Sequence, residues 1–312
     1  MTVAAGTLAF EPGAASVADY FALLKPRVMS LVLFTAVVGM LVAPVSPDPW
    51  TAITALLCIA IGAGASGALN MAYDSDIDAL MTRTATRPIP MGRIARGDAL
   101  AFGWTLAAGS VAVMALFVNA LAAFLLAFSI SFYVFVYTLW LKRRTAQNIV
   151  IGGLAGSLPP AIGWAAATGT LALAPLLLVL IVFLWTPPHF WALALYRSDD
   201  YARAGIPMLP VVSGKRAARR HILGYAMALA PLGVVPAAIG MAGLLYAVVA
   251  VSFGAWFIID AWAVLREHDD IREPSARRLF GVSILYLFVL FAALMVERLA
   301  GLPPFPTLGG WA

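Results

Sequence analysis

The sequence predicts an all-α polytopic membrane protein with nine transmembrane helices. Of its 312 residues, 62% are hydrophobic and 11% are charged, whereas soluble domains carry roughly 25% charged residues. Apolar runs long enough to cross a bilayer, about 20 residues each, recur along the whole chain. No internal stretch suggests a separate soluble domain, so we expect residues 1–312 to form one transmembrane domain.

Nine apolar runs are the expected spans. They cover residues 28–45, 51–73, 98–117, 120–140, 148–167, 172–195, 221–240, 242–264 and 279–299. A short interfacial helix over 18–27 should precede the first, because Tyr20 and Phe21 stand among charged residues and Pro26 marks the entry to the membrane. Residues 1–17 contain no Lys or Arg, unlike a secretory or transit peptide, so we expect a short disordered tail.

The basic residues orient the chain. All but one of the 20 Lys and Arg residues lie before the first span or after an even-numbered span, and basic loops face the cytoplasm. The N-terminus is then cytoplasmic and the tail 301–312 periplasmic, in a bacterial inner membrane. The net charge of +5 is spread over these loops and does not indicate nucleic-acid binding. The single cysteine, Cys58, excludes an intramolecular disulfide.

The end of the second span carries the polar residues on which the functional prediction depends. Asn70, Asp74 and Asp78 are spaced four apart, which places them on neighbouring turns of one helix face. Carboxylates at a membrane boundary are costly unless a positive group accompanies them. A Mg²⁺ ion with a phosphate-bearing substrate would satisfy this need, because Mg²⁺ takes one or two carboxylates and completes its shell with water and phosphate oxygens. Asp76 points to another side of the helix and is not expected to join that cation.

Basic residues follow at the same side of the membrane. Arg83 and Arg87 lie in the loop after the acidic stretch, and Lys142 and Arg143 end the fourth span. Arginine binds phosphate groups through its planar fork, so Arg83 and Arg87 could clamp a diphosphate. Two plainer interpretations stay open: the loop charges pair with one another in solvent, and Lys142 and Arg143 only anchor the end of a span.

The sixth span contains two prolines directly before His189. Pro187 and Pro188 remove two backbone donors, so we expect a break in the helix, which is tolerated beside a cavity. If the helix resumes, His189, Tyr196 and Asp200 share one face. Asp200 could then reach a metal at the rim while His189 faces the cavity. The alternative is a histidine that is hydrogen-bonded within the packing.

Two further features concern the second half of the chain. Asp260 lies inside the eighth span and needs a partner or a polar cavity. The loops after spans two and six both follow an acidic helix end and contain prolines, at 87–91 and 205–210. This similarity suggests two four-helix halves in tandem plus a ninth helix, although proline is common in any loop.

Several segments resemble a known family. The pattern Asn70-xxx-Asp74-xxx-Asp78 resembles the first aspartate-rich motif of the intramembrane prenyltransferases of the UbiA superfamily. More narrowly, four segments look like the protohaem IX farnesyltransferases, or haem O synthases; they are residues 19–28, 70–88, 141–153 and 185–212. The last contains Pro-Pro-His-Phe-Trp and Ala-Gly-Ile-Pro-Met-Leu-Pro, the stretches that point to haem.

The resemblance implies a cavity open toward the cytoplasm and a Mg²⁺-dependent prenyl transfer. Farnesyl diphosphate would ionise, and a vinyl group of haem B, which is a substrate rather than a cofactor, would attack the allylic cation. Water would complete the addition and give haem O for terminal oxidases. The matching catalytic residues are Asn70, Asp74, Asp78, Lys142 and Arg143; the first three would bind the metal. The matching substrate-binding residues are Lys25, Arg27, Arg83, Arg87, His189, Tyr196 and Asp200.

The sequence departs from the wider superfamily at the second acidic motif. That motif usually holds two acidic groups one turn apart, but Tyr196 stands four residues before Asp200, so a second full metal site is in doubt. Prenylation of an aromatic quinone precursor is one alternative function. A secondary transporter that uses Asp74, Asp78, Asp200 and Asp260 is another, although the acidic groups cluster at one face of the membrane instead of at the midplane. Besides the lipid bilayer, a homo-oligomer or a haem A synthase is a candidate partner.

Overall fold

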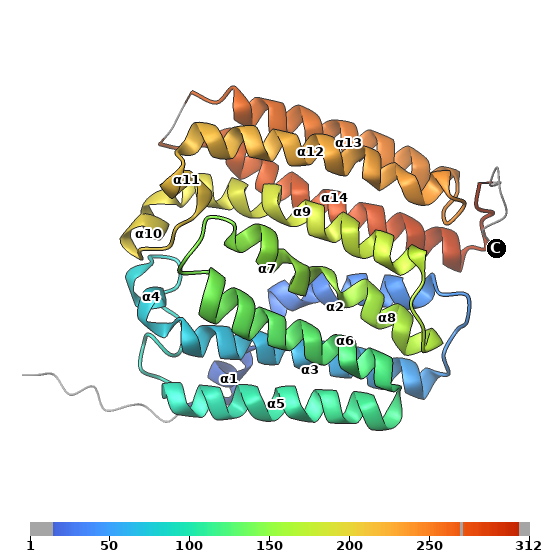
Figure 1. Cartoon of the computed structure of the whole chain (residues 1–312), viewed down its shortest axis with the longest axis horizontal. Coiled ribbons are helices and arrows are strands. Elements are labelled where there is room, and N and C mark those ends of the chain that lie inside the picture. Colours follow the sequence, from blue (N-terminus) through green and yellow to red (C-terminus); the bar gives the residue numbers. More distant parts are fainter. Residues whose placement is uncertain (1–14, 269–270, 306–312) are drawn as a thin grey trace, which may run out of the picture.

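The computed structural model describes residues 15–268 and 271–305, and these residues form helices and connecting loops without a strand (Figure 1). Eight spans are long and apolar enough to cross a membrane alone. They are α3 (Pro49–Tyr73), α5 (Arg96–Phe117), α6 with the π-helix η1 (Ala120–Ser131, Phe132–Leu141), α7 with α8 (Asn148–Ser157, Pro159–Thr168), α9 (Leu173–Tyr196), α12 (Lys215–Ala238), α13 (Leu244–Leu265) and α14 (Pro274–Leu299). The prediction of an all-α polytopic membrane protein is confirmed.

The first expected span is a bent pair of helices. α1 (Val17–Leu23) and α2 (Pro26–Leu41) meet at 52°, and they give a ninth span if the pair is counted as one. A short helix does precede the first span, but it ends at Leu23 instead of Arg27, and residues 26 and 27 already belong to α2. Lys25, in the bend between the two helices, adopts φ 51°, in the left-handed region, and a right-handed helical conformation is disfavoured at a residue that precedes proline.

The termini differ in part from the predicted tails. Val17 already belongs to α1, and Ser16 forms a capping box with Asp19. The other residues of the expected disordered tail, 1–14, lie outside the described residues. Of the expected outer tail 301–312, residues 301–305 are described, and the Phe305 amide donates to the Ala242 carbonyl at 3.1 Å.

Helix α9 runs without interruption through Pro187 and Pro188, so the break expected at these prolines is wrong. α9 packs against α7, α12 and α14, and tertiary packing of this kind lets a membrane helix tolerate missing backbone donors. The chain breaks instead at Arg197, before α10 (Ser198–Arg203). His189 and Asp200 therefore lie on separate helices and do not share one continuous face.

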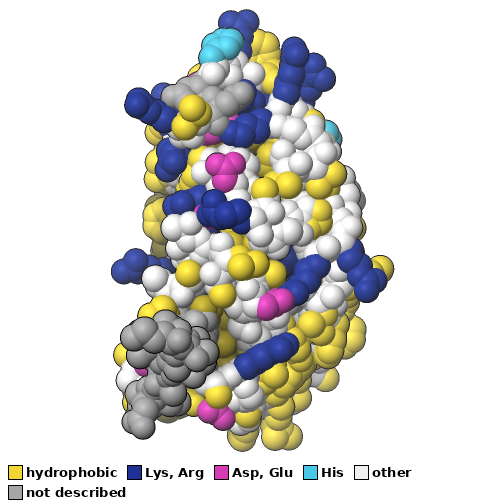
Figure 2. Space-filling model, turned by 90° about the vertical axis from the view of Figure 1, so that its left-hand side faces the viewer, with side chains coloured by type: hydrophobic (Ala, Val, Ile, Leu, Met, Phe, Trp, Pro, Cys, Tyr) yellow, Lys and Arg dark blue, Asp and Glu magenta, His cyan; other side chains and the backbone are white. Residues whose placement is uncertain are grey.

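The short helices α4 (Ser75–Leu80), α10 and α11 (Leu209–Val212) gather at one end of the molecule, on the left of Figure 1. We call this the charged end, because Lys and Arg side chains are spread over it with few Asp or Glu between them (Figure 2). Arg298 lies at the opposite end of α14, where it donates to the carbonyls of Leu41 and Ala43 at 3.0 and 3.1 Å. This residue, the one basic residue outside the loops that are predicted to be cytoplasmic, thus caps the end of α2.

Two buried acidic side chains in the second half have partners that the sequence does not identify. Asp260, whose partner the sequence does not identify, pairs with Arg278 at 2.9 Å. Glu297 accepts hydrogen bonds from the Gly243 and Tyr246 amides at 2.7 and 2.8 Å, and so caps the start of α13.

Two glycines let α2 and α8 cross closely. A Cβ on Gly163 would stand 2.1 Å from the Ala36 carbonyl oxygen, and a Cβ on Gly39 would stand 2.1 Å from the Pro160 carbonyl oxygen. Small residues at such crossings allow backbones to approach in membrane proteins.

We expect Gly163→Ala to lower the free energy of unfolding by about 1–3 kcal/mol, because the new methyl group meets backbone that must move. The matched control is Gly156→Ala in the same span, where a Cβ has nothing within 4 Å. Thermal unfolding in detergent, followed by tryptophan fluorescence, measures both variants. Equal melting temperatures for the two variants would contradict the close crossing.

Candidate functional site

Asn70, in the last turn of α3, joins three parts of the chain. Its Oδ1 accepts a hydrogen bond from Lys25 Nζ at 2.9 Å, and its Nδ2 donates to Asp74 Oδ2 at 2.6 Å and to Thr138 Oγ1 at 3.2 Å. Lys25 comes from the bend between α1 and α2, and Thr138 from η1. Every polar atom of the Asn70 amide group is thereby engaged, which holds the side chain in one orientation.

Asp74 ends α3 and begins α4, and its side chain is 1% exposed. It forms an ion pair with Lys142, which follows η1, and Arg143 stands 3.8 Å from its Oδ1. The Asp74 amide donates to the Asn70 carbonyl at 2.9 Å, and the Asp78 amide donates to the Asp74 carbonyl at 2.8 Å. The helical spacing predicted for Asn70, Asp74 and Asp78 is therefore kept, despite a change of helix at Asp74.

Asp78 is paired through the loop that follows α4. Its Oδ2 accepts from Arg87 at 2.6 Å, and the Thr84 hydroxyl donates to its carbonyl at 2.8 Å. The loop thus folds back on α4 and brings Arg87 to the buried carboxylate. Both acidic residues of the motif are neutralised by basic residues, as the low dielectric of a membrane edge requires.

Asp76 lies apart from this cluster, as expected. It is exposed and binds the Arg143 guanidinium through two hydrogen bonds of 2.7 and 2.8 Å. These bonds hold the pKa of Asp76 below its ordinary value. Arg143 therefore donates hydrogen bonds to the exposed Asp76, and its distance to Asp74 is longer, at 3.8 Å.

The other predicted basic residues are less engaged. Arg83 is exposed and lies in the loop after α4. Arg27 is exposed as well, and its guanidinium forms no hydrogen bond or ion pair with the described residues. The structure thus brings Lys25, Arg87 and Lys142 to the buried cluster and leaves Arg27 outside it.

Asp200 joins α10 to the loop after α4. Its Oδ1 pairs with Arg203 and accepts from the Thr82 hydroxyl at 3.0 Å. Its Oδ2 is buried and lacks a hydrogen-bond partner among the described residues, and Arg197 stands 3.8 Å from it. The loops after the second and sixth spans are therefore in direct contact.

Asp74 Oδ1 is also buried without a hydrogen-bond partner in the described part of the chain. Buried carboxylate oxygens are normally satisfied, so these two oxygens are the candidate ligands for a hard cation. No group of three or more His, Cys, Asp or Glu side chains among the described residues could hold a metal ion by itself. This donor set suits Mg²⁺, which needs few protein ligands when phosphate oxygens and water supply the rest.

His189 is packed between two aromatic rings. Its ring stacks on Trp185 and Phe280, with centroid distances of 4.3 and 4.5 Å. Its Nδ1 lies 2.7 Å from the Ser283 hydroxyl, which itself donates to the Phe280 carbonyl at 2.6 Å. Because that hydroxyl has one proton, Nδ1 must be the donor to Ser283, and we infer the tautomer with an unprotonated Nε2.

Tyr196 is held by Arg277, whose guanidinium lies over the ring at 4.5 Å from its centroid. Tyr196 and Asp200 therefore belong to different contacts rather than to one helix face. Tyr196 lies against α14, whereas Asp200 lies against the loop after α4.

Sequence reasoning missed several polar neighbours of these residues. They are Thr82, Thr138, Arg203 and Ser283. Thr138 stands four residues before Lys142, a spacing that could have indicated a shared side of the fourth span. It also lies in a π-helix, a rare element that is frequent at functional sites. Ser283 is a polar residue within a membrane span, which is a weaker signal.

Fold and site define a class: a polytopic helical membrane protein with a buried, charge-balanced acidic cluster at one end of its spans. Comparison with known proteins gives the family. The UbiA prenyltransferase family matches residues 32–289, and the chain belongs to this family.

Relatives match over nearly the whole chain. A protoheme IX farnesyltransferase of Parvibaculum lavamentivorans is 57% identical, over 95% of this chain and 94% of the relative. One of Nitrobacter hamburgensis is 60% identical, over 92% of each chain.

Solved structures share the fold at low identity. A digeranylgeranylglyceryl phosphate synthase has a TM-score of 0.75 and 16% identity, over 91% of this chain and 99% of that one. A UbiA homologue from Archaeoglobus fulgidus bound to DMAPP and Mg²⁺ has a TM-score of 0.67 and 18% identity, over 88% of this chain and 99% of that one.

We expect Lys142→Met to lower the free energy of unfolding by about 3 kcal/mol, because it leaves the buried Asp74 carboxylate without its ion partner. The double variant Asp74→Asn/Lys142→Met removes both charges and should recover most of this loss. Unfolding in detergent measures both, with the exposed neighbour Arg144→Met as the control. If Lys142→Met and Arg144→Met melt at the same temperature, the ion pair does not stabilise Asp74.

Proposed function

We propose that this protein transfers the farnesyl group of farnesyl diphosphate to a vinyl group of haem B, giving haem O and diphosphate. The observation that carries the proposal is the buried cluster of Asn70, Asp74 and Asp78 with its basic partners. The identity of 57 and 60% to protoheme IX farnesyltransferases supports haem B as the acceptor. The product would serve terminal oxidases.

The basic residues would stabilise the leaving group. A diphosphate carries about three negative charges, and preorganised cations lower the barrier where that charge develops. Lys142 and Arg87 already stand at the acidic pair, Lys25 at Asn70, and Arg83 nearby in the loop. Arg143 would add charge at the rim.

Asn70, Asp74 and Asp78 would hold Mg²⁺, and the unpartnered Oδ1 of Asp74 supports this assignment. When bound, the ion supplies Lewis-acid stabilisation of the diphosphate oxygens. The A. fulgidus homologue binds Mg²⁺ together with a prenyl diphosphate, which supports the same pairing here. Asp200, with its own buried unpartnered oxygen, would contact the substrate from the neighbouring loop.

The reaction needs no protein nucleophile. The bond between farnesyl C1 and the diphosphate oxygen breaks, and its electron pair leaves with the diphosphate. The vinyl π electrons form the new carbon–carbon bond, and water adds to the resulting cation and loses a proton. The protein must keep water from the allylic cation until the vinyl group attacks, which an apolar cavity open toward the charged end would achieve.

Haem B would bind in that proposed cavity, beside His189. The inferred tautomer leaves its Nε2 lone pair available, while the two stacked rings fix the plane of the imidazole. Tyr196 and Arg27 would complete the substrate contacts at the rim.

The proposed setting is the bacterial inner membrane. The many basic side chains of the charged end (Figure 2) support a cytoplasmic position for it. The N-terminus would then be cytoplasmic and the C-terminus periplasmic, with the whole chain forming one transmembrane domain. A haem A synthase, which would consume the product, and a second copy of the chain are the partners we would test.

We expect Asp74→Ala and Asp78→Ala to abolish turnover, a loss of at least about 10²-fold in rate, because each removes a metal ligand and unbalances the site. Haem binding should persist in both variants. The assay incubates purified protein with haem B, farnesyl diphosphate and Mg²⁺ and detects haem O by chromatography.

The matched control is Asp76→Ala, which removes an exposed carboxylate from the same short helix and should retain activity. Wild-type rates in Asp74→Ala or Asp78→Ala would remove the metal-site proposal. If the wild-type protein prenylates an aromatic acid and makes no haem O, the acceptor is the aromatic acid and not haem B.

A further inference from the structure

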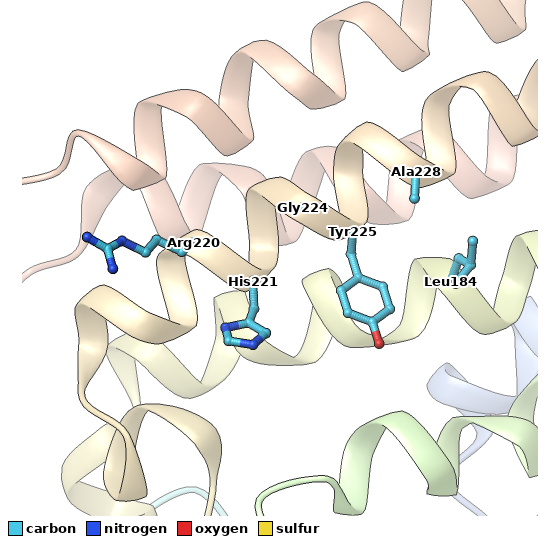
Figure 3. A pocket seen from close by; sticks show the side chains of 6 residues that line it. All are labelled: Leu184, Arg220, His221, Gly224, Tyr225 and Ala228. Atoms are coloured by element: carbon cyan, nitrogen blue, oxygen red, sulfur yellow. The ribbon is translucent and has the colours of Figure 1, made fainter.

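A second site lies on the other side of α9. A groove of about 490 Å³ runs between α9 and α12 (Figure 3), within the roughly 300–1,000 Å³ of small-molecule sites. Its lining residues are Leu184, Arg220, His221, Gly224, Tyr225 and Ala228. No function is assigned to any of them above.

The groove is separated from the surroundings of His189 by α9 itself. Trp191 packs edge-on against His221 and Tyr225, with centroid distances of 5.7 and 5.4 Å. His189 and Trp191 are two positions apart on one helix, so their side chains point roughly 160° apart. His189 contacts α14 through Ser283, whereas Trp191 backs the groove.

The His221 imidazole lines the groove, and its Nε2 has no hydrogen-bond partner among the described residues. Its Nδ1 lies 2.9 Å from the Ala217 carbonyl oxygen, one turn earlier on α12. A carbonyl can only accept, so Nδ1 carries a proton, and in the neutral imidazole the lone pair is on Nε2. Metal-binding histidines commonly have this arrangement, in which the second ring nitrogen donates to a backbone carbonyl.

Two small residues, Gly224 and Ala228, line the groove beside His221. Gly224 and Ala228 follow His221 on the same face of α12, and a Cβ on Gly224 would have nothing within 4 Å. Figure 3 shows the rings of His221 and Tyr225 pointing the same way from α12, and the guanidinium of Arg220 extending away from them along the groove. No other described residue forms a hydrogen bond or ion pair with Arg220, which is exposed.

We propose that this groove docks an iron porphyrin, with His221 Nε2 as the axial ligand of the iron and Arg220 as the partner of a propionate carboxylate. The porphyrin ring would lie beside Gly224 and Ala228, and Arg220 would bind the propionate carboxylate. A phospholipid would use Arg220 through its phosphate but would leave the imidazole lone pair unused. The inference rests on the proposed function, because haem B is the iron porphyrin that it would supply to the reaction site.

The test uses the fact that the chain has only three histidines, His189, His221 and His268. Full-length protein with a histidine-free affinity tag is placed in nanodiscs and titrated with ferric haem, without farnesyl diphosphate. Absorption and electron paramagnetic resonance spectra report imidazole ligation. We expect His221→Gln to weaken one haem-binding event at least about tenfold and to remove its imidazole signature, whereas the exposed His268→Gln leaves both unchanged.

Two matched probes separate ligation from packing. Iron-free protoporphyrin IX should bind equally to the wild type and to His221→Gln, because it has no iron to ligate. Arg220→Gln should weaken haem binding but not the binding of haem dimethyl ester, which lacks free carboxylates. An unchanged haem titration in His221→Gln, or an equal loss with iron-free porphyrin, would overturn the proposal.

The haem O assay keeps this inference distinct from the proposed function. One result would be that haem binding depends on His221 while the wild-type protein makes no haem O. This result would support the proposed haem site in the groove and overturn the proposed function. Haem O formation together with a His221→Gln titration identical to wild type would support the function and overturn the groove.

Discussion

Pairing of buried carboxylates with cations from distant parts of the chain organises the charged end. Asp74 draws Lys142 to the end of α3, Asp78 folds the following loop around Arg87, and Asp260 holds Arg278. An ion of this kind costs several kcal/mol to bury alone, and a buried pair loses about 3–5 kcal/mol when one partner is removed. The need to pair each of these buried carboxylates with a cation therefore holds the helix ends together.

The same pairing prepares the chemistry. Without substrate, the acidic and basic groups of the site pair with one another. A diphosphate bound with a divalent cation carries both signs of charge, so the cation could bind the acidic groups and the diphosphate the basic groups. In the proposed complex the carboxylates would face the metal and the basic residues would face the phosphate. Such preorganisation is where electrostatic catalysis obtains most of its effect. The proposed position of the acceptor is elsewhere, beside the stacked imidazole of His189.

Local patterns in the sequence predicted much of this arrangement, because membrane spans and i, i+4 spacing are local properties. The number of spans, the line from Asn70 to Asp78 and the separate position of Asp76 could be predicted in this way. The partner of Asp260, the contact of Asp200 with Thr82 and the stacking of His189 depend on residues far apart in sequence. The continuity of α9 through Pro187 and Pro188 likewise depends on its neighbours, which a sequence pattern does not contain.

The central claim is that the acidic cluster receives the diphosphate as its metal complex. Calorimetric titration with an unreactive farnesyl thiolodiphosphate measures this directly, with Mg²⁺ and with a chelator. The account predicts much tighter binding with Mg²⁺ in the wild type and in Asp76→Asn, and loss of that dependence in Asp74→Asn and Asp78→Asn. Equal affinity with and without Mg²⁺ in the wild type would contradict it.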